Sequence, residues 1–151
     1  KLHALLEKSF PRAHAALKRE VVNDLSLLYT WPGSDAAARP IMLMAHQDVV
    51  PIAPGTERDW QADPFAGEIR DGFVWGRGAW DDKANLFAIF EAIETLATSG
   101  FRPRQTIYIA SGHDEEIGGE QGGKALYDLR ALTAADADVD RRGFGLLGFH
   151  H

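Results

Sequence analysis

The stretch that decides the fold is Ile41-Met42-Leu43-Met44-Ala45-His46-Gln47-Asp48. Its first five residues form a short continuous apolar run, which is typical of a β-strand buried on both faces in a layered α/β protein. The three polar residues that follow place an imidazole and a carboxylate directly where this strand ends. Open α/β sheets bind their ligands at the carboxyl ends of strands. The stretch therefore predicts a central strand and the edge of the sheet at which a site should be sought.

Two other strand candidates and one long amphipathic segment surround this strand. Residues 106–110 form a second continuous apolar run, and the alternation over residues 25–31 is typical of a third strand. Residues 86–97 place their apolar side chains on one helical face, and Gly100 is suited to end that helix. Short helices are also expected over residues 2–10, over residues 9–17 and after Gly119, and Asp71-Gly72 predicts a tight turn before a brief strand. This order predicts an α/β layer fold with a mostly parallel core.

The composition limits the classes of function that the chain can have. Its 151 residues suit one domain, and the formal net charge of -6 argues against a nucleic-acid-binding protein, which is usually basic. No run of 18 apolar residues is present, so no segment is expected to span a membrane. The chain contains no cysteine. Disulfides and thiolate ligands are therefore excluded, and any metal would have to be held by His, Asp or Glu.

Three polar clusters follow the predicted strands. In the first, His46 and Asp48 are two residues apart, so in an extended segment they point to the same side and the carboxylate can orient the imidazole. The second cluster, residues 76–83, is rich in glycine and contains two adjacent aspartates just before the long helix. The third, residues 114–116, is a run of three carboxylates after the second buried strand.

Each cluster also has a purely structural interpretation. A loop histidine can sit beside a solvated carboxylate, an aspartate before a helix often caps it, and consecutive acidic residues can form a solvated loop. Taken together, however, the clusters supply imidazole and carboxylate ligands at strand ends without any thiolate. That ligand set suits zinc and also cobalt or manganese. Hydrolysis by a metal-activated water would use such a metal together with a nearby base.

Five motifs occur in an order that resembles a known enzyme family. They are MAHQDVVP at 44–51, WQADPF at 60–65, DG at 71–72, GRGAWDDK at 76–83 and DEEIGG at 114–119. Together they resemble the di-zinc metallopeptidases that include aminoacylase, glutamate carboxypeptidase and carboxypeptidase S, and most of all the branch of carboxypeptidase S and the N-fatty-acyl-amino-acid hydrolases. The resemblance covers roughly residues 2–132. It implies a fragment of a three-layer α/β/α catalytic domain with a mixed, mostly parallel sheet and without the lid and dimerisation domain.

The resemblance implies a role for each matching residue. His46 would bind one zinc ion, Asp81 would bridge two zinc ions and Glu116 would bind the second. Asp48 would orient His46, and Glu115 would be the general base that takes a proton from a water bridging the metals. The implied reaction is hydrolysis of an amide bond next to a free carboxylate. The implied substrate is a small peptide or an N-acyl amino acid.

Other matching positions are expected to support the site. Asp63, Arg77 and Lys83 are interpreted as structural supports, and the resemblance implies a cis peptide bond directly after Asp81. The family needs another acidic ligand beyond the glutamate pair, and Asp140 is the candidate for it.

Residues 1–132 are therefore expected to form a partial catalytic domain, and residues 133–151 a divergent or disordered tail. Two hypotheses stay open. The chain is either a segment of an active metallohydrolase or a truncated, non-catalytic remnant that binds metal weakly or not at all. A homodimer is compatible with the full-length family but is not expected from this segment. Because the chain begins at Lys1 rather than Met, the compartment also stays open, with the cytoplasm slightly favoured.

Overall fold

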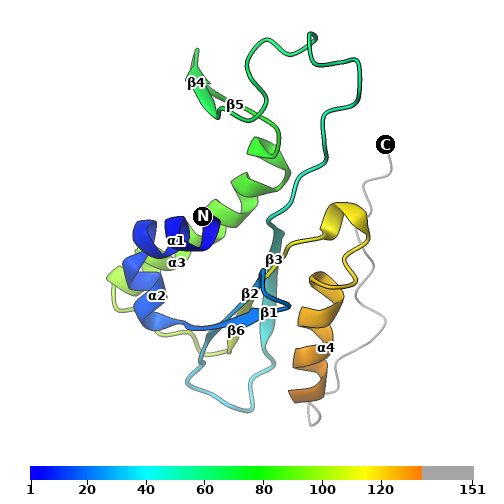
Figure 1. The fold of residues 1–151 in the computed structure, drawn as a ribbon. Coiled ribbons are helices and arrows are strands. Elements are labelled where there is room, and N and C mark those ends of the chain that lie inside the picture. Colours follow the sequence, from blue (N-terminus) through cyan, green and yellow to red (C-terminus); the bar gives the residue numbers. More distant parts are fainter. Residues whose placement is uncertain (134–151) are drawn as a thin grey trace.

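The computed structural model describes residues 1–133, and its elements are labelled as in Figure 1. The helices are α1 (Leu2–Ser9), α2 (Pro11–Ala16), α3 (Asn85–Thr98) and α4 (Gly123–Thr133), with short helical turns η1 (Ala79–Ala84) and η2 (Glu115–Ile117). The strands are β1 (Lys18–Val22), β2 (Ser26–Trp31), β3 (Ile41–His46), β4 (Glu68–Arg70), β5 (Phe73–Trp75) and β6 (Ile107–Gly112). The expected tail and Asp140 lie outside the described residues.

The main sheet has the strand order β1-β2-β6-β3. Strands β3 and β6 are parallel, and their register pairs Ala45 with Ser111 and His46 with Gly112. Both strands therefore end at the same level. The backbone N–H of Gln47 continues the pairing by donating to the carbonyl of Gly112 at 2.7 Å. The polar residues that follow the two strands are consequently brought side by side.

The sheet is mixed, as expected, but fewer of its strand pairs are parallel than the sequence predicted. Within residues 1–133, only β3 and β6 are parallel, while β1 pairs with β2 and β2 with β6 in antiparallel fashion. The reason is local for β1 and β2. Asn23 and Asp24 adopt positive φ angles of 48° and 65°, so three residues reverse the chain and force an antiparallel pair. Strand β1 itself was not predicted from the sequence.

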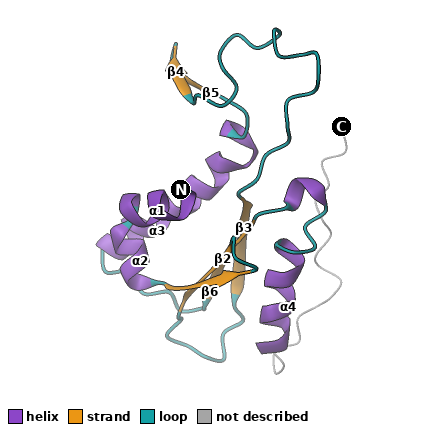
Figure 2. Ribbon diagram, viewed as in Figure 1, coloured by secondary structure: helices purple, strands orange, loops and turns teal. Residues whose placement is uncertain are grey.

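Helices cover both faces of the sheet, which confirms the three-layer α/β/α arrangement (Figure 2). On one face, Leu6 of α1, Ala13 of α2 and Phe90 of α3 pack against β2 and β6. On the other face, Leu126 of α4 packs against Leu28 and Ala110. Successive residues of a strand point to opposite faces, so β2 supplies side chains to both layers. All of β2 except Thr30 is consequently buried.

The expectation that residues 41–45 are buried on both faces is wrong for part of the strand. Ile41, Leu43 and Met44 are 43%, 37% and 45% exposed. Strand β3 is the last strand in the order of the described sheet, and its one neighbour there is β6. Only the end of the strand is enclosed, where Ala45 and His46 are buried. The functional end of β3 is therefore its best packed part.

The elements around the sheet follow the sequence closely in two places. Helix α3 spans the predicted amphipathic segment, and Gly100 follows it with a φ of 76°, a conformation that suits glycine after a helix. Asp71 and Gly72 form the tight turn of the β4–β5 hairpin, with φ values of 53° and 81°. The hairpin and the long loop before it project from the sheet where β3 ends (Figure 1). In residues 1–133, no helix is long and apolar enough to cross a membrane.

Candidate metal centre

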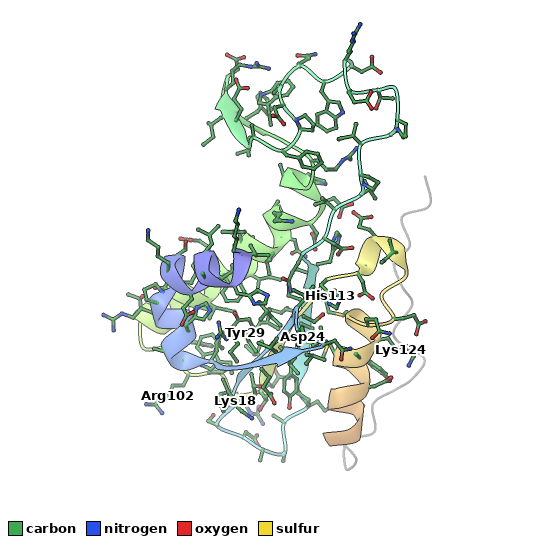
Figure 3. All side chains as sticks on the ribbon, viewed as in Figure 1. Lys18, Asp24, Tyr29, Arg102, His113 and Lys124 are labelled. Carbon is green, nitrogen blue, oxygen red and sulfur yellow. The ribbon has the colours of Figure 1, made fainter. Side chains whose placement is uncertain are left out.

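Three separate segments supply the candidate site. They are the end of β3 with His46 and Asp48, the turn η1 with Asp81, and the turn η2 with Glu115 and Glu116. Strands β3 and β6 end at the same level, which brings the first and third segments together. Turn η1 joins them because it leads into α3, which packs on the same sheet. His113, labelled in Figure 3, marks this edge of the sheet at the end of β6.

His46 lies at the centre of this group and is only 8% exposed. Its Nε2 atom is 2.8 Å from Oδ1 of Asp81 and 3.9 Å from Oε2 of Glu115. On the other side of the ring, Nδ1 lies 3.2 Å from the carbonyl oxygen of Asp48 and 3.4 Å from its Oδ1. The imidazole is therefore held from the Nδ1 side by Asp48, while Nε2 faces the other carboxylates.

Asp48 connects His46 with the glutamate pair. Its Oδ1 accepts a hydrogen bond from the backbone N–H of Glu115 at 3.2 Å, and its Oδ2 accepts one from the N–H of Glu116 at 3.0 Å. One carboxylate thus satisfies two backbone donors of η2 while lying beside the imidazole. The sequence predicted only the contact with His46. Nothing in the local pattern indicates the bonds to η2, because they join residues 67 and 68 positions apart.

Asp81 and Asp82 take different positions although they are adjacent. The peptide bond between them is cis, as the resemblance implied. The Asp81 side chain is 70% exposed and faces His46, whereas Oδ2 of Asp82 accepts the backbone N–H of His46 at 3.1 Å. Neither aspartate is the N-cap of α3, which begins at Asn85 without a side-chain cap. The interpretation of this pair as a helix cap is therefore wrong.

Lys83, Asn85 and Gln47 fix the backbone around the site. Lys83 Nζ donates to the carbonyl of Gln47 at 2.6 Å, and Asn85 Nδ2 donates to the carbonyl of Met44 at 2.9 Å. The Gln47 amide in turn donates to the carbonyls of Ser111 and Leu25. Lys83 was expected to be a support, but Asn85 and Gln47 were not. In the sequence, Gln47 lies between His46 and Asp48, and Asn85 lies two residues after Lys83.

One ligand atom each from His46, Glu115 and Glu116 lies within 4.8 Å of the other two. Together with Asp81, this group offers an imidazole and carboxylates without thiolate, a donor set that fits zinc and also cobalt or manganese. The residues present therefore fit a divalent metal. His113 is turned to other contacts, because its Nδ1 lies 2.6 Å from the hydroxyl of Ser26. Asp140 lies outside the described residues.

The charges of the site disturb two of its groups. Burial by itself lowers the pKa of His46. The hydrogen bond with Asp81 and the charges of Asp82, Asp81 and Glu115 outweigh burial, so the pKa of His46 is raised above 6.5. For Glu116, burial and then the neighbouring charges of Asp81 and Glu115 raise the pKa. The neighbouring carboxylates contribute to both shifts, and a divalent cation would neutralise this negative charge.

A cleft of about 240 Å³ opens beside this group. Asp81 and Glu116 belong to its lining, together with Trp60, Arg77, Trp80 and Val50. The cleft therefore adjoins two of the predicted metal ligands, which gives a bound molecule access to them.

Comparisons with known proteins identify the family of the chain. The model of peptidase family M20/M25/M40 matches residues 42–145. Carboxypeptidase S of Saccharomyces cerevisiae is 50% identical over 127 residues, which make up 83% of this chain and 22% of that protein. The N-fatty-acyl-amino acid synthase/hydrolase PM20D1 of Mus musculus is 44% identical over 149 residues, 95% of this chain and 29% of that protein. The chain thus spans only 22% and 29% of the length of these two relatives.

Solved structures share the fold. Human carnosine dipeptidase 1 superimposes with a TM-score of 0.63 at 23% identity, over 89% of this chain and 29% of that one. The M20 family metallo-carboxypeptidase Sso-CP2 of Sulfolobus solfataricus does so with a TM-score of 0.57 at 21% identity, over 77% of this chain and 26% of that one. The family model spans more than half of the sequence, including every residue of the candidate site from His46 to Glu116. The chain belongs to peptidase family M20/M25/M40.

Proposed function

We propose that this chain carries the site of a zinc-dependent hydrolase that cleaves an amide bond next to a free carboxylate. The observation that carries the proposal is the convergence of His46, Asp81, Glu115 and Glu116 from three segments that are distant in sequence. The substrate class is a small peptide or an N-acyl amino acid. The relatives named carboxypeptidase S and N-fatty-acyl-amino acid synthase/hydrolase support both choices.

The residues divide into metal-holding, orienting and proton-transferring groups. His46, Asp81 and Glu116 would hold two zinc ions, with Asp81 shared between them and Asp140 as a further predicted ligand. Zinc would supply Lewis-acid chemistry, by acidifying a water and stabilising negative charge that develops on the substrate. Asp48 holds the Nδ1 side of His46 and fixes the backbone of η2. Glu115 is the general base, which accepts a proton from the attacking water and passes one to the leaving amine.

The second candidate is the alternative that the sequence left open. In this alternative the chain is a non-catalytic remnant of the family that binds metal weakly or not at all. An assay of the 151-residue chain with added zinc, on a dipeptide and on an N-acyl amino acid, decides between the two candidates. Turnover of either substrate supports the hydrolase, and the absence of turnover on both substrates supports the remnant.

The substitution Glu115→Gln tests the proposed base. The amide cannot accept the proton, so we expect turnover to fall on the order of 100-fold or more while zinc is retained. Zinc content and turnover should be measured on the same sample. Glu91→Gln is the matched control, because Glu91 is an exposed glutamate of α3. A variant that keeps both its zinc and its turnover would remove Glu115 as the base.

A further inference from the structure

The backbone of β3 needs partners at His46 on the side that faces away from β6. The N–H groups of Ile41 and Gln47 donate to backbone carbonyls on the β6 side, at 3.0 Å and 2.7 Å. Along a parallel strand, alternate residues bond to the same neighbour, so the residues at even positions direct their N–H and C=O groups the other way. Met44 and His46 are two of these residues, and they face the free edge of the described sheet.

Asp82 and Asn85 provide the partners at this edge. Oδ2 of Asp82 accepts the N–H of His46 at 3.1 Å, and Nδ2 of Asn85 donates to the carbonyl of Met44 at 2.9 Å. The two side chains also contact each other, because Nδ2 of Asn85 lies 3.3 Å from Oδ2 of Asp82. One residue of a neighbouring parallel strand would offer the same acceptor and the same donor. The pair therefore takes the place of one residue of such a strand.

The anchored end is also the enclosed end of β3. His46 is 8% exposed, whereas Leu43 and Met44 are 37% and 45% exposed. The side chain of Asp82 is half-buried beside it. A buried backbone N–H that lacks an acceptor is unfavourable, so Asp82 removes a cost that the N–H of His46 would otherwise carry.

The same turn holds the backbone of His46 and faces its imidazole. Asp82 directly follows Asp81, whose Oδ1 lies 2.8 Å from Nε2 of His46. Asp48 contacts the ring on the Nδ1 side, but it follows His46 by only two residues in the same segment. Asp82 comes from η1 and fixes the backbone of His46 from outside that segment. The backbone bond and the ring contact together define where the imidazole lies relative to Asp81.

We propose that Asp82 and Asn85 are positioning residues, which fix the end of β3 so that His46 and Asp81 are correctly spaced to bind a divalent metal. The inference rests on the proposed function, because it concerns the metal ligands of the same site. It adds two residues that act through His46 and are not predicted ligands themselves.

Amide hydrogen exchange tests the anchor in the metal-free chain. The ¹⁵N-labelled protein is freed of metal with EDTA, and the exchange rate of the His46 N–H is measured by NMR. We expect exchange to be roughly tenfold faster in Asp82→Ala, because the N–H loses its acceptor. Asp82→Asn keeps an oxygen acceptor at the same place and should exchange nearly as slowly as the wild type. Asp59→Ala, at an exposed aspartate of the loop before β4, is the matched control.

Zinc affinity tests whether the anchor positions a ligand. Competition with a chromophoric chelator should show a loss of about tenfold or more in Asp82→Ala, as is usual when a group that orients a metal ligand is removed. Asn85→Ala should lose less, because it acts through Met44, and Asp82→Asn should stay close to the wild type. Asp59→Ala should leave the affinity unchanged.

A spectrum separates positioning from a general loss of stability. Cobalt suits the same donor set, and the visible absorption of bound Co²⁺ reports the geometry of its ligands. We expect this spectrum to change in Asp82→Ala and in Asn85→Ala but not in Asp82→Asn. Urea unfolding of each variant gives its stability, and Asn85→Ala carries the comparison if Asp82→Ala does not fold.

Three results would overturn the proposal. The first is a zinc affinity that neither alanine substitution lowers. The second is a loss in Asp82→Asn as large as in Asp82→Ala, because the charge rather than the hydrogen bond would then matter. The third is a loss of affinity with an unchanged cobalt spectrum, which would show that the pair only stabilises the fold.

Failure of this inference is distinguishable from failure of the proposed hydrolase. A chain that hydrolyses nothing but binds zinc more weakly in Asp82→Ala contradicts the hydrolase and leaves the positioning role intact. A chain that hydrolyses its substrates and binds zinc equally well in wild type and Asp82→Ala contradicts only the positioning role. A wild-type chain that binds no zinc contradicts both.

Discussion

Asp114, which directly precedes the glutamate pair, anchors the loop that follows the pair. It is 6% exposed, its Oδ2 accepts the backbone N–H of Gln121 at 2.7 Å, and its carbonyl accepts the N–H of Gly119 at 2.8 Å. Its Oδ1 is buried without a partner. Gly122 lies directly against this oxygen and leaves no room for a Cβ atom. The sequence shows an acidic run here, but only the structure shows that its first member is buried.

The substitution Gly122→Ala tests this packing. The new Cβ would press on Oδ1 of Asp114 and lie 2.9 Å from the backbone nitrogen of His113, so the Asp114 side chain and the backbone around it must shift. We expect a loss of about 1–3 kcal/mol in the free energy of unfolding, as for overpacked sites, and weaker zinc binding. Urea unfolding and calorimetric zinc titration measure the two effects. Gly123→Ala is the matched control, because no atom lies within 4 Å of its added Cβ. Equal behaviour of the two variants would contradict the packing argument.

The buried phenol of Tyr29 makes the free energy of unfolding depend on pH. Burial raises the pKa of its phenol from 10.0 to about 12, and the hydroxyl lies 3.1 Å from Nε2 of His14. Between these two pH values the unfolded chain loses the phenolic proton while the folded chain keeps it. The stability that Tyr29 contributes is therefore complete below pH 10.0 and falls as the pH rises toward about 12, by about 2–3 kcal/mol.

The measurement is urea unfolding of the wild type and of Tyr29→Phe at a series of alkaline pH values. The phenylalanine variant has no proton to lose, so the difference in stability between the two chains should shrink as the pH rises above 10.0. All other titratable groups are the same in the two chains, so their contribution cancels in this difference in stability. A difference that stays constant over this pH range would show that Tyr29 ionises equally in both states.

At the scale of elements, helix α3 stabilises the start of helix α2. The side chain of Glu94 accepts the backbone N–H of Arg12 at 3.1 Å and that of Ala13 at 2.7 Å. The N-cap residue of α2 provides no side-chain hydrogen bond of its own. A carboxylate from another helix accepts the free N–H groups at the start of α2 instead. A negative charge at this end of a helix is also favourable for the helix dipole.

We expect Glu94→Ala to lower the free energy of unfolding by about 1 kcal/mol, the usual value for a lost N-cap. Thermal or urea unfolding measures the change. Glu91→Ala provides the comparison on the same helix, because Glu91 is exposed and Glu94 is half-buried. The capping interpretation fails if both substitutions destabilise the chain equally.

At the scale of the whole molecule, a metal would connect segments that the backbone leaves separate. The predicted ligands come from β3, η1 and η2, which lie on different parts of the layered fold. If zinc binds only the folded chain, its binding stabilises the fold by mass action. At a free zinc concentration of about 100 times the dissociation constant, the gain is about 2.7 kcal/mol.

We therefore expect the melting temperature to rise with zinc concentration and not with magnesium, which prefers oxygen ligands and open octahedral sites. His46→Ala should abolish the zinc effect, while Glu91→Gln should leave it unchanged. Differential scanning fluorimetry over a zinc series measures the shift. If zinc raised the melting temperature of the His46→Ala variant as much as that of the wild type, zinc would bind at another site.

The sequence by itself determined the elements whose signals are local. The apolar run before His46, the amphipathic period of α3 and the Asp71-Gly72 turn predict their elements correctly, because period and turn chemistry act over a few residues. His46, Asp81 and Glu115 each lie in a motif of the family, so their places in the sequence are enough to make them candidates for the site.

Only the tertiary structure decided how these residues are held. The Asp48 carboxylate accepts bonds from residues 67 and 68 positions away, and the guanidinium of Arg77 lies over the ring of Trp60. Strand β1 pairs with β2 although none of its residues is fully buried. The exposure of β3 likewise follows from its place in the sheet order. Such contacts depend on strand order and register, which are set by the packing of the whole chain and leave no periodic trace in the residues that make them.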